Sequence, residues 1–357
     1  MLSYIIKKTL YAMATLFGVV TVVFFLFNIL PGDPARMMLD QNENSEQLLA
    51  IKKKYGFDKP ISTQYLLYLN DLSPISYHSK NKEDYTYNSG KYTATTLLSL
   101  SNSEIVLKSP YLRESFQKNG KKVSTIISET LPNTILLAVL AIAIALVIGV
   151  FLGIISALFH NTWLDRLIAL VSTFGMSIPS FFSAILFAWI FGYLLHEYTH
   201  LPMTGSLYEV DDFGEGKHLA LRNCILPSIV LGIRPLAVVT QLMRNSLLEV
   251  LSQDYIRTAK AKGLPMSLII RKHALKNSLN PVITALSGWF ASMLAGAVFV
   301  EYIFGWNGLG KEIVEALNTL DLPVIMGAVL IIATAFVIIT ILVDLIYAYL
   351  DPRVKLN

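Results

Sequence analysis

Histidine and cysteine are the first residue types to consider as ligands of a zinc ion. His196 and His200 stand four residues apart, a spacing that could place both on one face of a helix. No nearby cysteine and no glutamate in an HExxH arrangement accompanies them. Cys224 is the only cysteine, which excludes an internal disulfide, a four-thiolate zinc site and a CxxC redox pair. We therefore expect no metal and no cofactor, and we interpret the histidines as residues of surface loops.

A glycine-rich segment and an isolated acid are the other candidates for chemistry. Gly305-Trp-Asn-Gly-Leu-Gly310 superficially has the glycines of a phosphate-binding loop, but it follows an apolar helix pattern and is not followed by Gly-Lys-Ser or Gly-Lys-Thr. We interpret it as a turn between two helices. Asp344 is the only acid well within an apolar run and has no partner aspartate there, as an intramembrane protease would require. The sequence thus predicts a protein that is not an enzyme and does not itself hydrolyse ATP.

A basic segment near residue 260 has the properties of a docking element. Ser252 is predicted to cap a short helix, with Asp254 in its first turn and Gly263 just past its end, followed by Pro265. The helix is narrow because it contains Ala259 and Ala261. Its basic rim consists of Arg257, Lys260 and Lys262. It would fit a cleft on another protein, or lie on anionic lipid headgroups. A second amphipathic helix is predicted over 265–279, and Asn280-Pro281 should interrupt it.

The composition places these features in a membrane protein. Of 357 residues, 54% are hydrophobic and 15% charged, and the mean hydropathy is +0.54. This is too apolar for a soluble globule or a disordered chain, and a net charge of +4 gives no support for a nucleic-acid partner. Six apolar stretches have about the length of a membrane-spanning helix: 9–30, within 134–159, within 167–195, 225–243, 281–300 and 322–343.

Charges in the short loops predict the orientation of these spans. The segment between spans four and five is strongly basic, whereas the loops on either side of it, between spans three and four and between spans five and six, are acidic. We therefore expect the basic segment and both termini to be cytoplasmic, and the polar region after span one to be external. The first span is followed by Leu30-Pro-Gly-Asp-Pro rather than by a small-x-small cleavage site, so we interpret it as an uncleaved anchor.

Several motifs along the chain are considered together. The basic segment, Tyr255-Ile-Arg-Thr-Ala-Lys-Ala-Lys-Gly263 followed by Arg271-Lys-His-Ala-Leu-Lys-Asn-Ser-Leu-Asn-Pro281, resembles the EAA loop of the dipeptide/oligopeptide permease family of ABC importers. Other elements of the same family are resembled by residues 30–35, 55–60, Gln64-Tyr65, 301–310 and 350–353. Three departures are Arg257-Thr-Ala259 in place of Glu-Ala-Ala, Asn307 where proline is usual, and a longer external loop.

The resemblance implies an all-α, six-helix, type-1 ABC importer permease of the bacterial plasma membrane. Its domains would be an anchor at 1–30, an external region at 31–124, the transmembrane domain at 125–350 and a cytoplasmic tail at 351–357. Its partners would be a second, C-type permease, two ABC ATPases, an external solute-binding protein and membrane lipid. The residues expected to couple it to an ATPase are Tyr255, Arg257, Thr258, Ala259, Lys260, Ala261, Lys262 and Gly263. The implied substrate is a di- or oligopeptide, with nickel or another small solute as the alternative.

Arg234 is the one cation deep within a predicted span. It precedes Arg244 by ten residues, a helical rise of about 15 Å, or about half of a 30 Å core. Either it lines the pathway and attracts a peptide carboxylate, or it is paired with Glu301 or with an acid of the second permease. An ion-coupled secondary transporter is the rival class, although the spans show no inverted repeat of broken helices.

Overall fold

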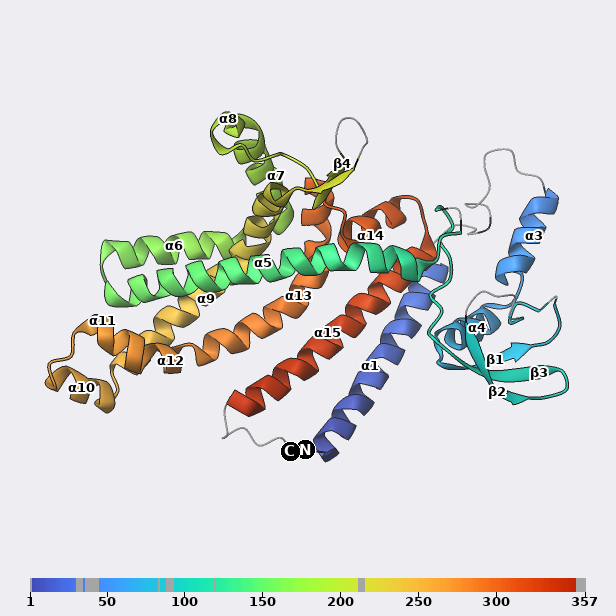
Figure 1. Ribbon diagram of the computed structural model, residues 1–357, viewed down its shortest axis with the longest axis horizontal. Helices are drawn as coiled ribbons and strands as arrows, with labels where there is room; N and C mark the ends of the chain where they lie inside the picture. Colours follow the sequence, from blue (N-terminus) through green and yellow to red (C-terminus); the bar gives the residue numbers. More distant parts are fainter. Residues whose placement is uncertain are drawn as a thin grey trace. The chain divides into compact units, whose positions relative to one another are not determined.

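The computed structural model describes residues 2–29, 35, 45–82, 84–87, 93–118, 120–210 and 216–350, and these are mainly helical (Figure 1). The motif at 30–35 lies outside the described residues except for Ala35, and so does the predicted tail at 351–357. The start of α5 at Val123 falls next to the predicted boundary at residue 125.

Helices occupy all six predicted spans. Four helices are long and apolar enough to cross a membrane: α1, Leu2–Ile29; α5, Val123–Leu158; α9, Ile225–Leu251; and α15, Leu322–Leu350. The other two spans are bent: α6, Trp163–Ser177, continues through α7, Ser180–Phe187, into the π-helical η1, Ala188–Leu194; and α13, Asn280–Phe304, bends within itself. The described residues thus contain four spans, or up to six if each bent pair is one span.

Pro179 explains the sharper of the two bends. The helix axes on either side of it differ by 107°. Ile178, the residue before the proline, is extended, with φ −77° and ψ 130°. The proline ring disfavours helical dihedrals at the preceding residue, so α6 has to end there, and α7 begins directly after Pro179. The proline therefore interrupts the third of the predicted spans.

The described chain divides into two compact units, of which the first comprises Met1–Leu10, Thr130–Val314 and Thr334–Asn357 as far as they are described. Its core is built on α5, α9 and α13. Glycines allow α5 and α9 to approach closely: a Cβ at Gly149 would lie 2.7 Å from Val239 Cγ1, and one at Gly153 would lie 2.6 Å from Met243 Cβ. Small residues at four-residue spacing are a common basis for close helix packing in membranes.

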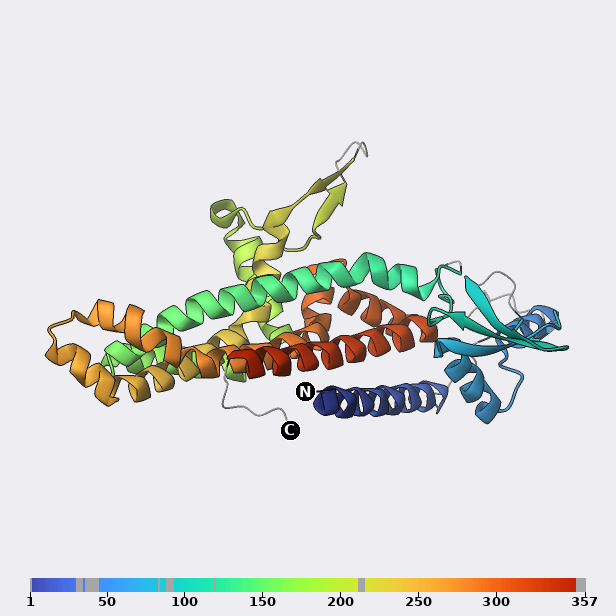
Figure 2. The same ribbon diagram turned by 60° about the horizontal axis from the view of Figure 1, so that its bottom comes forward.

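Shorter elements complete the first unit. One group follows α6 and α7: α8, His196–Thr199; the β4–β5 hairpin, Tyr208–Val210 with Lys217–Leu219; and η2, Leu221–Cys224. The other group follows α9: α10, Asp254–Ala261; α11, Met266–Ile269; the π-helical η3, Ile270–Ala274; and α12, Leu275–Ser278. The two groups are well separated in both views (Figures 1 and 2). Helix α14, Leu309–Asn318, begins in this unit and ends in the other.

The second unit comprises Tyr11–Glu129 and Glu315–Ala333 as far as they are described. It contains α3, Ser45–Tyr55, and α4, Ile61–Leu72, followed by a small sheet. The strands are β1, Ile75–Ser79; β2, Ala94–Ser99; and β3, Ser103–Lys108. They pair antiparallel in the order β1-β3-β2, with Tyr77 opposite Ile105 and Thr95 opposite Leu107.

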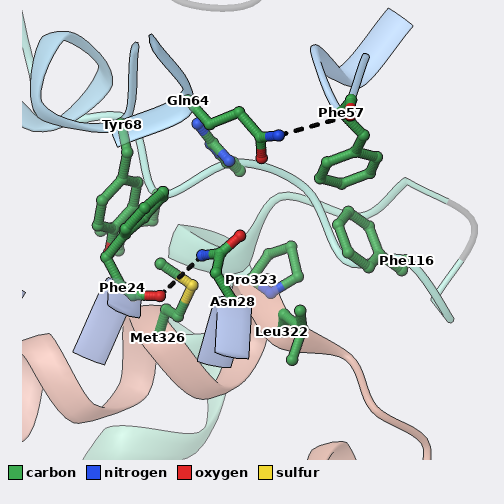
Figure 3. A pocket seen from close by; sticks show the side chains of 11 residues that line it. Phe24, Asn28, Phe57, Gln64, Tyr68, Phe116, Leu322, Pro323 and Met326 are labelled. Atoms are coloured by element: carbon green, nitrogen blue, oxygen red, sulfur yellow. Dashed lines mark hydrogen bonds between the residues drawn. The ribbon is translucent and has the colours of Figure 1, made fainter. Parts of the chain in front are cut away.

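Polar and aromatic contacts hold the second unit together around Asp71. Its Oδ2 accepts hydrogen bonds from Arg113 Nε and from the Tyr85 hydroxyl, both at 2.9 Å. Arg113 also lies over the ring of Tyr68, and burial raises the pKa of the Tyr68 hydroxyl to about 12, which keeps it neutral. Tyr68 also lines a small pocket with Phe24 and Met326, in which Asn28 Nδ2 donates to the Phe24 carbonyl at 2.7 Å (Figure 3).

Candidate functional site

The predicted docking helix exists as α10, Asp254–Ala261, but its start differs from the prediction. Ser252 remains helical, with φ −85° and ψ −10°, and ends α9; its Oγ donates to the Glu249 carbonyl at 2.7 Å. The N-cap is Gln253, which is extended and makes no side-chain capping bond. The prediction of Ser252 as the cap was therefore wrong by one residue, because the chain leaves helical geometry at 253 rather than at 252.

The end of α10 confirms the predicted glycine stop. Gly263 has φ +76°, in the left-handed region where a Cβ is unfavourable. Its N–H donates to the Lys260 carbonyl at 2.9 Å, and Leu264 N–H donates to the Ala259 carbonyl at 3.3 Å. This pair of bonds is the Schellman motif, which satisfies carbonyls at a helix C-terminus. Gly263 thus sets the direction in which the chain leaves α10.

Helix α10 has one face packed on its own protein and one face exposed. Ile256 and Ala259 are buried and belong to a core cluster with Met243 and Leu247 of α9. This corrects the prediction that Ala259 helps to form the narrow outer surface. The remaining predicted contact residues are exposed: Tyr255, Arg257, Thr258, Lys260, Ala261, Lys262 and Gly263. Of the two alanines, Ala261 is therefore the one available to a partner.

The exposed face of α10 is basic and continues into the next segment. Arg257 forms an ion pair with Asp254 at 3.3 Å, but the two side chains are 73% and 94% exposed, so this pair contributes little to stability. Tyr255 accepts a hydrogen bond from Asn277 Nδ2 at 2.9 Å, which connects α10 to α12. Arg271 and Lys272 are exposed as well. Such a surface suits an acidic cleft or an anionic lipid headgroup layer.

The second amphipathic helix is present but is not uniform. It runs through α11, η3 and α12, so one turn within it is π-helical. The interruption predicted at Asn280-Pro281 is confined to Leu279, because Pro281 stands in the first turn of α13, where its missing N–H has no helical partner to lose. Ile283 N–H donates to the Leu279 carbonyl at 2.9 Å, so the helical hydrogen bonds resume at once.

The glycine-rich segment is a turn between α13 and α14, as predicted. Gly305 ends α13 with φ +67°. Glu301 is fully buried, and its Oε2 accepts hydrogen bonds from the N–H groups of Gly310 at 2.7 Å and Lys311 at 3.3 Å, at the start of α14. A Cβ at Gly308 would lie 2.3 Å from the same oxygen, so glycine is required there.

Arg234 is exposed on α9, and its Nη2 lies 3.5 Å from the Met176 carbonyl of α6. Glu301 binds the start of α14 instead, and no ion pair between Glu301 and Arg234 occurs among the described residues. The proposed pairing of Arg234 with Glu301 was therefore wrong. His196, one of the candidate metal ligands, has its Nδ1 hydrogen-bonded to the Leu201 carbonyl at 2.7 Å. Within the described ranges, no group of three or more potential metal ligands occurs.

Comparison with known families identifies the fold that carries this loop. The profile of the binding-protein-dependent transport system inner membrane component matches residues 149–356, and the profile of the N-terminal region of such components matches residues 1–82. The chain belongs to this ABC permease family. The matched range of the permease includes α9, α10 and the turn after α13.

Relatives of this permease are named for peptide transport. It is 33% identical to the dipeptide transport system permease protein DppB of Alkalihalophilus pseudofirmus, over 99% of this chain and 100% of that protein. It is 31% identical to the di/tripeptide transport system permease protein DppB of Pseudomonas aeruginosa, over 99% of each chain. It is 30% identical to the glutathione transport system permease protein GsiC of Escherichia coli, again over 99% of each chain.

A solved structure supports the fold of the permease. A chain of the MetNI methionine ABC transporter, in an inward-facing conformation, matches with a TM-score of 0.51 and 16% identity. The match covers 64% of this chain and 97% of the other. The predicted type-1 ABC permease fold is thereby confirmed.

Proposed function

We propose that the chain is a permease subunit of an ATP-driven importer of di- and oligopeptides, and that α10 couples it to a separate ATPase. The exposed basic face of α10, ending at the left-handed Gly263, is the observation that carries the coupling role. The peptide names of three relatives support the substrate class. The other proposed components are a C-type permease, two ABC ATPases and a solute-binding protein. We propose six spans, with the domain boundaries given above.

Ala261→Trp tests docking of the ATPase. We expect the purified variant to keep the wild-type melting temperature but to lose at least tenfold in ATPase retention and in peptide uptake, because Ala261 is exposed and tryptophan does not fit a narrow cleft. Ala259→Trp is the matched comparison: Ala259 is 7% exposed, so overpacking should lower the melting temperature. Normal ATPase retention and uptake by Ala261→Trp would exclude docking and favour a helix that lies on lipid, where tryptophan is well tolerated.

The charge asymmetry of the loops supports an orientation with both termini cytoplasmic. Asn81 and Lys262 are both exposed, so a cysteine at either position is open to a labelling reagent. In a chain in which buried Cys224 is replaced, we expect an impermeant maleimide applied to intact cells to label position 81 and not position 262. The opposite labelling pattern would reverse the proposed orientation.

We also propose that Arg234 lines the pathway and attracts the carboxylate of a passing peptide. Its exposure on α9 makes the guanidinium accessible to a ligand, and only its Nη2 contacts a backbone carbonyl, that of Met176 at 3.5 Å. Arg234→Gln keeps polarity and removes the charge. We expect this variant to assemble and to lose several-fold in preference for free-carboxylate over C-amidated peptides in uptake assays. A wild-type ratio in an assembled variant would exclude carboxylate steering.

A further inference from the structure

An ion pair between a buried carboxylate and a half-buried arginine joins the helices next to the docking loop. Asp165, in the first turn of α6, is 3% exposed. Arg244 of α9 binds it with both prongs of the guanidinium: Nε lies 2.7 Å from Oδ1, and Nη2 lies 2.8 Å from Oδ2. Ser156 Oγ of α5 donates to Oδ1 at 2.5 Å, and Asn161 N–H donates to Oδ2 at 2.9 Å. One carboxylate thus connects α5, the turn after it, α6 and α9.

The pair lies next to the residues through which α10 packs against α9, so it is close to the point where a displacement of α10 would be transmitted to the membrane helices. Arg244 stands beside Met243, whose buried side chain shares a core cluster with Ile256 and Ala259 of α10. Apolar contacts have little directional preference of their own. A two-pronged guanidinium–carboxylate bond fixes both rotation and register, because two parallel hydrogen bonds must be kept.

A second contact connects the same two helices farther along. Arg234 reaches the Met176 carbonyl, and a Cβ at nearby Gly175 would lie 3.1 Å from Ile233 Cγ2. The two contacts are ten residues apart on α9 and eleven on α6, in opposite chain directions, so the helices are held at both ends of their shared length. We infer that Asp165 and Arg244 are positioning residues that make α6 and α9 move as one body, carrying displacement of α10 to the region of Arg234.

This inference rests on the proposed function, and a doubly neutral variant tests it. Asp165→Asn with Arg244→Gln keeps hydrogen-bonding side chains without leaving an unpaired buried charge. We expect the complex to assemble with its ATPase and to hydrolyse ATP at the basal rate. We expect its stimulation by solute-binding protein loaded with dialanine, and the peptide carried per ATP, to fall at least tenfold. A purely structural pair would lower the melting temperature without changing the amount of peptide carried per ATP.

Controls separate the possible outcomes. Lys121→Gln with Glu129→Gln removes an exposed ion pair of 2.5 Å and should leave coupling unchanged. If the doubly neutral variant does not assemble, Arg244→Lys is the variant to measure. Lysine keeps the positive charge but cannot form the two parallel hydrogen bonds of the guanidinium. Wild-type coupling in the Arg244→Lys variant would overturn the inference. Wild-type coupling in the doubly neutral variant would also overturn it, leaving the proposed function intact. No peptide-stimulated hydrolysis by the wild type would overturn both.

Discussion

Gly263→Val is expected to reduce stimulated ATP hydrolysis and peptide uptake by about tenfold or more while the membrane helices stay folded. A Cβ at Gly263 would have no atom within 4 Å, so crowding is not the cause. The cause is the φ of +76°, which a β-branched residue adopts only with strain of about 1–3 kcal/mol. Strain of 2 kcal/mol changes a local population about 30-fold. The two bonds that close the C-terminus of α10 would then be lost, and its exposed face would be misdirected.

Gly263→Asn is the matched control, because asparagine tolerates the left-handed region far better than valine does. We expect it to keep most of the stimulated hydrolysis. The measurement is ATP hydrolysis of the reconstituted complex with and without loaded solute-binding protein, beside the melting temperature of each variant. Equal activity of the valine and asparagine variants, at equal melting temperature, would show that the bend at Gly263 plays no part in coupling.

Gly153→Val is expected to destabilise the first unit more than any loop substitution. A Cβ there would lie 2.6 Å from Met243 Cβ and 2.8 Å from the Thr240 carbonyl oxygen, which belongs to the α9 backbone. The helices would have to separate, at a cost of about 3 kcal/mol. The checking measurement is thermal unfolding in detergent, where we expect a fall of several degrees.

The comparison variant for this packing prediction is Gly18→Val in α1, where a Cβ would meet nothing within 4 Å. Both substitutions replace glycine by valine in an apolar helix, so the change in intrinsic helix propensity is similar. Only Gly153 faces another helix at close range. Equal melting temperatures for the two variants would refute close packing of α5 on α9.

The sequence allowed the helices to be located, because an uncharged stretch of about 20 residues has few structural alternatives. The C-terminus of α10 was also predictable, since glycine followed by proline is a local signal. The inward direction of Ala259 was not, because alanine suits a buried or an exposed position equally well. The N-cap at Gln253 gave no side-chain signal at all, since its side chain makes no capping bond.

Contacts between residues far apart in the chain were the main feature that the sequence did not predict. Asp165 stands next to Arg166 at the edge of an apolar stretch, and nothing local connects it with Arg244, which is 79 residues away. An acid in the first turn of an apolar helix was the available signal. Glu301 was one of the partners considered for Arg234, whereas its Oε2 accepts hydrogen bonds from backbone N–H groups at the start of α14 instead. Every residue except proline has a backbone N–H group, so the sequence does not indicate which of these groups will bind a buried carboxylate.

The bend at Pro179 has a consequence for how the chain fits the thickness of a bilayer. A straight helix from Trp163 to Leu194 would be about 48 Å long, against a hydrocarbon core of about 30 Å. Such a mismatch would force strong tilting, local thickening of the bilayer, or exposure of apolar residues to water. Each arm alone is about 22 Å long and too short to cross. The bend of 107° makes the segment much shorter from end to end than a straight helix would be, which lessens its mismatch with the thickness of a bilayer.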